Sequence, residues 1–197
     1  MVFILRKIIS QRVAACFGIM APAWALVSIG ISIALSPWFS WTDNAISDLG
    51  VANVAPLFNF GLIVSGILAS LFIIGLARIN RKNLLGFVGS ISLLLSSLSL
   101  IGIGVFSEAF GLVHFYFSLA FFTLLIVSLI IFGIHFSLST ATRFLGIFTF
   151  LVGIISLSGW IGWAIVNLSG VAIPEMISII LASFWIFVLS IRMYREE

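Results

Sequence analysis

Charged residues are scarce in this sequence. Only 8% of its 197 residues are Asp, Glu, Lys or Arg, whereas 62% are hydrophobic. A water-soluble domain carries about 25% charged residues, so this chain has too little polar surface to cover a globule in water. The net charge is only +3, and we therefore expect no nucleic-acid partner.

Cysteine is nearly absent as well. Cys16 is the single one, so one chain can form neither a disulfide framework nor a cysteine metal site. Because Cys16 lies in an apolar run, we expect a small buried hydrophobic residue. The sequence also lacks a glycine-rich phosphate loop, a nucleophile elbow and an internal repeat, which leaves no motif that points to a specific chemistry.

The few charges are far apart, and most intervals between them are long enough for a membrane-spanning helix, which needs about 20 apolar residues. Five intervals meet this requirement, and a sixth does if its helix begins at Pro174 with Glu175 in the first turn. We predict an all-α fold, a polytopic bundle of six transmembrane helices in a single integral membrane domain over residues 1–197. The expected helices lie near residues 13–35, 56–77, 84–106, 112–135, 144–167 and 174–193.

All cations fall on one side of this predicted membrane. They occupy the N-terminal flank, the second and fourth gaps between helices and the C-terminal tail: Arg6, Lys7, Arg12, Arg78, Arg81, Lys82, Arg143, Arg192 and Arg195. Because such residues mark the cytoplasmic side, we expect a multi-pass cell-membrane protein with both termini cytoplasmic. The extracytoplasmic loops are then 36–55, 107–111 and 168–173. The apolar run after Arg12 is too long for a signal peptide, so we expect a retained helix.

The first extracytoplasmic loop contains the most polar stretch of the apolar region, WTDNAISDLG (41–50). Asp43 is expected to cap a short helical turn over residues 44–49 that ends at Gly50. Asn44 and Asp48 then lie on one face of that turn. This architecture competes with a second interpretation, in which Asp48 is a ligand or an acid.

Tryptophans help to place the predicted membrane boundary. Trp38 and Trp41 are expected in the outer headgroup layer, where amphipathic rings prefer to lie. Trp24 and Trp185 fall nearer the middle of the predicted membrane, and we expect both to pack inside the bundle.

Polar side chains from three separate connections are predicted to lie at the outer surface. Candidate catalytic residues are Asp48, Glu108, His114 and Glu175, and candidate structural residues of the polar loop are Asp43, Asn44, Ser47, Gly50 and Asn59. Carboxylates beside a histidine can coordinate a divalent metal ion or perform acid–base chemistry. No spacing here identifies a metal, so the cofactor stays open. His135 lies at the opposite end of its helix and is predicted to be an interfacial residue outside this cluster.

Two of these acids stand at predicted helix ends. Glu108 follows the end of the third helix, where a carboxylate interacts unfavourably with the helix dipole, so a compensating interaction is expected. Pro174 and Glu175 form an ordinary helix opening, with an acid near the positive end of the dipole. A structural role therefore competes with a chemical one for Glu175.

Four segments resemble the prokaryotic membrane-protein family catalogued as domain of unknown function 998: NAISDLG (44–50), PLFNFGLIVSG (56–66), GVFSEAFGLVHF (104–115) and IPEMISIILASFWI (173–186). The family has a proline before the acid of the third segment, where this chain has Ser107. The resemblance implies a six-helix integral membrane protein, mainly archaeal or bacterial, with no established activity. It assigns the family's polar positions to Ser47, Asp48, Asn59, Glu108, His114 and Glu175.

Three functions remain open from the sequence. The absence of charge deep in the predicted spans counts against a proton-coupled pump and favours a non-catalytic subunit or scaffold, with the lipid bilayer and other membrane subunits as partners. An outer-leaflet lipid-modifying or hydrolytic enzyme would use the Asp, Glu and His residues. A carrier of lipids or small amphiphiles would need a cavity between the helices.

Overall fold

The computed structural model describes residues 10–196, which form six long α-helices and two short 3-10 turns, with no β-strand in that range. The helices are α2 (Gln11–Ala34), α3 (Ala55–Asn80), α4 (Leu84–Val105), α5 (Leu112–Ser137), α6 (Arg143–Val166) and α7 (Ala172–Arg195), and the turns are η1 (Ile46–Gly50) and η2 (Glu108–Phe110). All six helices are long and apolar enough to cross a membrane. The predicted all-α fold with six spans is confirmed, and the chain is a multi-pass membrane protein. Arg6 and Lys7, which entered the orientation argument, lie outside the described residues.

The helix ends follow local capping chemistry. The Ser10 side chain accepts a hydrogen bond from the backbone N of Val13 at the start of α2, and Asn83 caps α4 in the same way, which satisfies free N–H groups of the first turn. At the end of α6, Asn167 adopts a left-handed conformation with φ 58°, a common way to stop a helix. The predicted start of the last helix at Pro174 is wrong, because α7 begins at Ala172. Glu175 still lies in its first turn.

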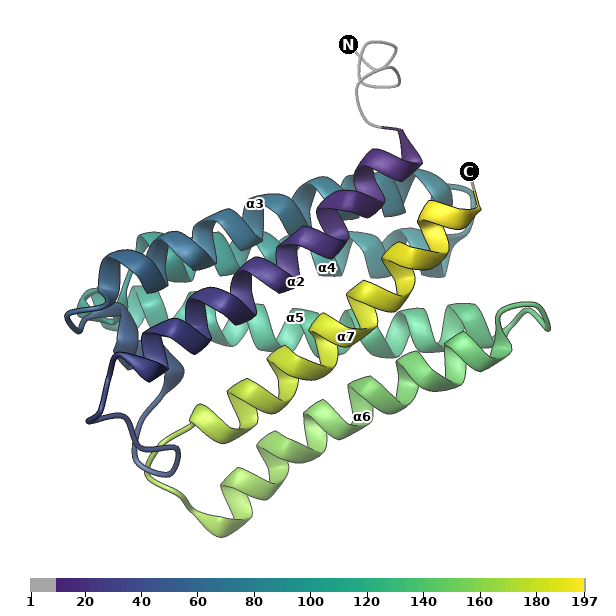
Figure 1. Cartoon of the computed structure of the whole chain (residues 1–197). Helices are drawn as coiled ribbons and strands as arrows, with labels where there is room; N and C mark the ends of the chain where they lie inside the picture. The colour runs from purple at the N-terminus through teal and green to yellow at the C-terminus, as the bar shows by residue number, and fades with distance from the viewer. Residues whose placement is uncertain (1–9, 197) are drawn as a thin grey trace.

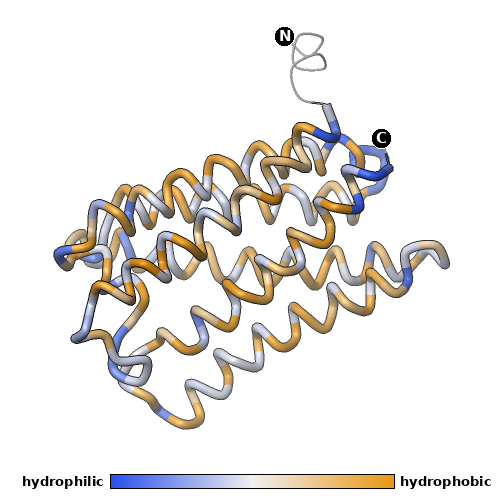
Figure 2. Tube along the Cα trace, in the orientation of Figure 1, coloured by the Kyte–Doolittle hydropathy of each residue, from blue (hydrophilic) through white to orange (hydrophobic). Residues whose placement is uncertain are grey.

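The six helices form a closed ring. Each helix packs against the next one along the chain, and α7 returns to pack against α2 as well as α6 (Figure 1). Successive helices run in opposite directions, so the loops fall into two groups (Figure 1). We call the end with loops 35–54, 106–111 and 167–171 the acidic end, and the end with loops 81–83 and 138–142 and the C-terminal turn of α7 the basic end. Figure 2 shows hydrophilic residues gathered at these ends, with largely apolar helices between them.

Small and hydroxyl-bearing residues join neighbouring helices inside the ring. The hydroxyl of Ser92 in α4 donates to the carbonyl oxygen of Leu124 in α5 at 2.9 Å. The indole Nε1 of Trp185 in α7 donates to Thr149 Oγ1 in α6 at 2.8 Å. Such interhelical hydrogen bonds and close approaches stabilise bundles in lipid, where burial of apolar surface gives little driving force between helices.

Two expectations for α2 are wrong. Cys16 is exposed instead of buried, and the Trp24 side chain is 46% exposed instead of packed in the interior. Helix α2 packs mainly against α3 and α7, so one of its faces is turned away from the bundle. Trp185 is fully buried, in agreement with its prediction.

Candidate functional site

The loop between α2 and α3, residues 35–54, lies across the acidic end and is attached to the α6–α7 connection. The backbone N of Gly170 donates to the carbonyl oxygen of Thr42 at 2.8 Å, and the N of Ala172 donates to that of Asn44 at 2.9 Å. A Cβ atom on Gly170 would overlap the backbone N and O of Asn44. Glycine is therefore required for this close backbone pairing, which fixes the position of what we call the long loop, residues 35–54.

Asp43 stabilises the same connection but does not cap the turn. Its carboxylate accepts hydrogen bonds from Ser40 Oγ at 2.5 Å, Thr42 Oγ1 at 3.0 Å and Ser169 Oγ at 3.2 Å. These hydrogen bonds hold the pKa of Asp43 below its usual value, and the bond from Ser40 has the largest effect. The predicted cap is wrong, because η1 begins at Ile46 and its N-cap residue is Ala45. Asp43 instead links the long loop to Ser169 of the α6–α7 connection.

Asp48 is held inside its own turn. Its Oδ2 accepts a hydrogen bond from Asn44 Nδ2 at 2.7 Å and one from the backbone N of Ala45 at 3.1 Å. Asn44 is fixed in turn, because its Oδ1 accepts from the backbone N of Ser40 at 2.9 Å. The proximity of Asn44 and Asp48 that their spacing suggested is therefore present, and the Asp48 carboxyl has one defined orientation.

Glu175 attaches the long loop to the last helix. Its side chain is only 6% exposed, and its Oε2 accepts a hydrogen bond from the backbone N of Ile46 at 2.7 Å. The carboxyl group thereby satisfies the first free N–H of η1, a group that would be costly to bury without a partner.

Glu108 completes a group of three carboxyls. Burial, first of all, and then a hydrogen bond with Asp48 and the negative charge of Asp48 together raise the pKa of Glu108 to about 7. Glu175 interacts electrostatically with both of these residues. We call Asp48, Glu108 and Glu175 the carboxyl cluster. Among residues 10–196, Glu108 Oε2 is buried without a hydrogen-bond partner.

His114 lies near this end but its ring is bonded elsewhere. Nδ1 is 2.8 Å from the carbonyl oxygen of Phe106, and Nε2 is 3.3 Å from Ser118 Oγ. Because a carbonyl can only accept, Nδ1 carries the proton and Nε2 accepts from the serine hydroxyl. In the described part of the chain, no group of three or more His, Cys, Asp or Glu side chains is placed to hold a metal ion.

Asn59, Gly50 and Ser47 surround the same turn. Asn59 Nδ2 donates to the carbonyl oxygen of Gly50 at 2.9 Å, and a Cβ on Gly50 would lie only 2.7 Å from Asn59 Oδ1. The first turns of α3 thus hold the end of η1. Ser47 faces inward, where it lines a small cavity of about 30 Å³ together with Ile46 and Glu175.

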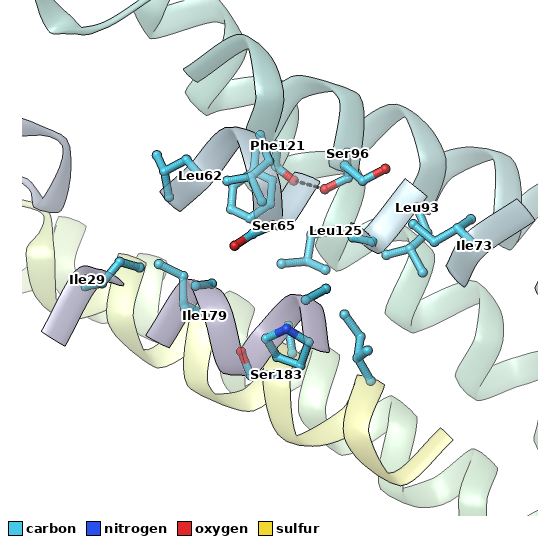
Figure 3. Close-up of a pocket in the computed structure, with 18 residues that line it drawn as sticks. Ile29, Leu62, Ser65, Ile73, Leu93, Ser96, Phe121, Leu125, Ile179 and Ser183 are labelled. Atoms are coloured by element: carbon cyan, nitrogen blue, oxygen red, sulfur yellow. Dashed lines mark hydrogen bonds between the residues drawn. The ribbon is translucent and has the colours of Figure 1, made fainter. Parts of the chain in front are cut away.

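Below this small cavity lies a larger one, of about 80 Å³, between α2, α3, α4, α5 and α7. Its wall is apolar apart from four serine side chains, Ser65, Ser96, Ser97 and Ser183. Figure 3 shows Ser65 and Ser183 among its aliphatic lining residues, and the hydrogen bond of 2.8 Å from Ser96 to the carbonyl oxygen of Phe121. The two cavities share five lining residues: Ile29, Leu62, Leu100, Phe121 and Ile179. The two cavities are therefore neighbours, and the smaller one is lined by one member of the carboxyl cluster, Glu175.

The family described as Protein of unknown function (DUF998) matches residues 19–192. The chain belongs to this family. No curated protein and no solved structure matches it. The match to the DUF998 family runs from α2 to the last turn of α7, so it includes the long loop, the carboxyl cluster and both cavities.

Sequence reasoning missed several residues of this DUF998 protein that make contacts in or near the sites described above. Gly170 gave no signal beyond its place in a short polar connection, because the need for glycine arises only from the distant Asn44. Ser118 was visible only as the residue one turn after His114. At the basic end, sequence reasoning gave His135 no partner, and its Nε2 lies 3.1 Å from Asn80 Oδ1. Asn80 is buried and His135 is partly exposed, and the pair joins the last turns of α3 and α5.

Proposed function

We propose that this DUF998 protein binds an amphiphile, with its apolar chain between the helices and its polar head at the carboxyl cluster. The observation that carries this proposal is the pair of adjacent apolar cavities, of about 80 and 30 Å³, of which the smaller is lined by Ser47 and Glu175. A carrier or receptor of amphiphiles needs such a cavity, whereas a scaffold does not. Ligand sites in general are mostly apolar and have few polar groups at defined positions.

The size of the cavity limits what the observed conformation accepts. A cavity of about 150 Å³ holds benzene, so the space here accepts only a short segment of an alkyl chain. A longer chain requires helices to move apart. Helix α7 is the best candidate, because it packs less extensively against α2 and α6 than the other neighbours pack against one another. Since α7 carries Glu175, its displacement would also release the long loop.

The chemistry of the acidic end favours a cationic or hydrogen-bond-donating head. The loops of this end contain no Lys or Arg, and three carboxyls converge there. Glu108 Oε2 has no hydrogen-bond partner among the described residues and is a ready acceptor. An ammonium or hydroxyl group at this position would satisfy it and would offset the mutual repulsion of the carboxylates.

A second candidate function is an acid–base reaction on a bound lipid. The specific observation in its favour is the pKa of Glu108, which is about 7. The carboxyl group of Glu108 interacts with that of Asp48. A general acid or base works best with a pKa near the ambient pH. In this alternative, Glu108 transfers the proton while Asp48 supplies the second carboxylate, and His114 takes no part because its ring is bonded to Phe106 and Ser118.

Binding is tested with two amphiphiles of equal chain length and opposite charge, dodecylamine and dodecyl sulfate. The full chain in phosphatidylcholine nanodiscs is incubated with each, and the bound amphiphile is counted by mass spectrometry of the intact protein. Ala25→Phe places a ring in the larger cavity, and Ala23→Phe places one on the exposed side of the same helix. We expect wild type and Ala23→Phe to retain dodecylamine, Ala25→Phe to lose it, and dodecyl sulfate to bind weakly throughout.

The head-group site is tested in the same assay with Asp48→Asn, which removes one negative charge of the cluster. We expect weaker retention of dodecylamine. Retention by wild type should increase as the pH rises through about 7, where Glu108 ionises. Equal retention of both amphiphiles, or unchanged retention in Ala25→Phe, would contradict the proposal.

A further inference from the structure

A third cavity, larger than the two above, lies at the opposite, basic end, and the proposed amphiphile site does not include it. Its volume is about 290 Å³, and it shares no lining residue with the interhelical cavity. It is bounded by α3, α5, α7, the first turn of α6 and the 138–142 loop. Half of its lining residues are polar: Asn80, His135, Ser139, Thr142, Arg192 and Glu196. At about 30 Å³ per water molecule, it has room for a polar group of roughly ten non-hydrogen atoms.

One wall of this cavity contains a buried acceptor without a donor. Asn80 Nδ2 donates to the carbonyl oxygen of Leu76 at 3.0 Å, so its Oδ1 is the atom that faces His135 Nε2 at 3.1 Å. An amide oxygen can only accept, and therefore the proton of His135 is on Nε2 and its Nδ1 has a free lone pair. Within residues 10–196, Nδ1 is buried and has no hydrogen-bond partner. A buried acceptor normally finds a donor, and the cavity has room for one.

The mouth of the cavity contains a cation. Arg192 donates from Nε to Glu196 Oε1 at 2.7 Å, in an ion pair whose side chains are 34% and 55% exposed. This bond uses one edge of the guanidinium, and we find no other partner for it in the described range, so its terminal NH₂ groups are available. Glu196 is the one acid that the structure describes at this end, which otherwise has basic residues at the start of α2, around the 81–83 loop, at the start of α6 and at the end of α7.

Hydroxyl groups and an apolar wall complete the lining. Thr142 donates its proton to the carbonyl oxygen of Phe136 at 2.6 Å, so its oxygen can still accept, while Ser139 lies on the exposed 138–142 loop. Ile79, which is 49% exposed, and Leu76 are apolar lining residues of the same cavity. The cavity therefore combines a cation, hydroxyls, an unpaired acceptor and an apolar flank.

We propose that the cavity at the basic end binds a phosphate group whose ester carries a free hydroxyl, as in a phosphoglycerol headgroup or in free glycerol phosphate. Arg192 pairs with the phosphate oxygens, because a planar guanidinium offers two parallel donors to such a group. The ligand hydroxyl donates to His135 Nδ1. Basic pockets between transmembrane helices on the cytoplasmic side commonly accept anionic lipid headgroups, and the apolar flank at Ile79 would receive the attached acyl chain.

The proposal makes opposite predictions for the two members of the ion pair. Arg192→Gln should weaken binding of the phosphate by about tenfold or more, the equivalent of one charge-assisted hydrogen bond. Glu196→Gln should strengthen binding, because the carboxylate competes for the guanidinium. Arg195→Gln is the matched control, since it removes the same charge from the same helix turn at a residue that does not line the cavity. Its effect should stay within about twofold.

The experiment measures retention of phosphatidylglycerol against phosphatidylcholine by mass spectrometry of the full chain released from mixed nanodiscs, and, in a second arm, binding of glycerol 3-phosphate. Preference for phosphatidylglycerol that Arg192→Gln abolishes supports a lipid source, and binding of glycerol 3-phosphate with the same variant pattern supports a free phosphate ester. Equal losses in Arg192→Gln and Arg195→Gln would indicate a general basic surface and overturn the proposal. Absence of binding in both arms would overturn it as well.

Two further measurements separate binding from a fold defect. Ser139→Phe fills the cavity from an exposed loop position and leaves Arg192 unchanged, so it should block binding, and retained binding would count against the site. In the ¹⁵N spectrum of histidine-labelled protein, His135 should show the Nε2–H tautomer, assigned with His135→Gln. Its Nδ1 resonance should shift when glycerol 3-phosphate or phosphatidylglycerol is added, and should not shift in Arg192→Gln. An Nδ1–H tautomer without ligand would contradict the argument.

Discussion

The carboxylate of Glu175, in the first turn of the last helix, accepts a hydrogen bond of 2.7 Å from the backbone N of Ile46, 129 residues earlier in the chain. This bond connects the long loop to the last helix at the acidic end of the bundle. It holds η1 above the small cavity, and it brings Glu175 within electrostatic reach of Asp48 and Glu108.

Replacing Glu175 tests the bond directly. Glu175→Ala leaves the N–H of Ile46 without its acceptor, and we expect a loss of about 1–3 kcal/mol in the free energy of unfolding. Glu175→Gln keeps a side-chain oxygen that can accept the same bond, so it should retain most of the stability. Thermal unfolding in detergent, followed by tryptophan fluorescence, gives the comparison. Equal losses in the two variants would mean that the charge, and not the bond, is what stabilises the loop.

The pH dependence of stability tests the Asp48–Glu108 contact. The pKa of Glu108 is about 7 in the folded chain, against an ordinary value of 4.5. Between these values the folded chain holds a proton that the unfolded chain has released, so the free energy of unfolding falls as the pH rises from 4.5 to about 7. Because Glu108 is only half-buried, solvent screening reduces the expected change to about 1–2 kcal/mol.

Glu108→Gln cannot ionise and should remove most of this dependence on pH. Melting temperatures of the wild type and the variant are compared from about pH 5 to about pH 8. Glu196→Gln is the control, because it changes an exposed acid at the basic end. A variant that loses stability with pH as steeply as the wild type would show that another group is responsible.

Gly170→Ala tests the backbone pairing of the long loop. Its new methyl group would overlap the backbone of Asn44, so the 170–172 segment must move away and the hydrogen bonds to Thr42 and Asn44 weaken. We expect a loss of about 2 kcal/mol or more in the free energy of unfolding. Gly162→Ala is a matched control, because a Cβ there meets nothing within 4 Å. In a helix interior this control should gain about 0.5–1 kcal/mol.

Labelling of whole cells tests the predicted orientation. In a Cys16→Ser background, Thr42→Cys places a thiol on the long loop and Lys82→Cys places one on a loop of the basic end. If cations mark the cytoplasmic side, a membrane-impermeant maleimide should modify the first variant in intact cells and the second only after lysis. The reverse pattern would invert the topology and would move the carboxyl cluster into the cytoplasm.

The helices could be predicted from the sequence because charge spacing and hydropathy act locally. The largest difference from the predicted boundaries is at the end of α3, which reaches Asn80 instead of residue 77. The exposure of Trp24 and Cys16 could not be predicted in the same way. Both a lipid-facing and an inward-facing side of α2 are apolar, so hydropathy carries no periodic signal that distinguishes them.

The sequence predicted which residues lie at the candidate site, but it did not predict their contacts. The presence of Asp48, Glu108 and Glu175 at one end follows from the helix count, but the partner of each carboxyl depends on contacts between distant segments. His114 illustrates the limit, because its proximity to Glu108 along the chain suggested a shared site. The end of α4 instead provides a carbonyl, that of Phe106, and the histidine ring bonds to it.

The bond between Glu175 and Ile46 also has a consequence for biogenesis. A ribosome delivers the long loop after the first span, yet the carboxylate that receives the amide of Ile46 arrives only with the sixth. Until then, the nascent loop lacks this anchor and the backbone pairing at Gly170 and Ala172. A truncated chain without α7 would insert five spans, and its long loop would lack these bonds. We expect quality-control proteases to cleave this loop faster than the loop of the full chain.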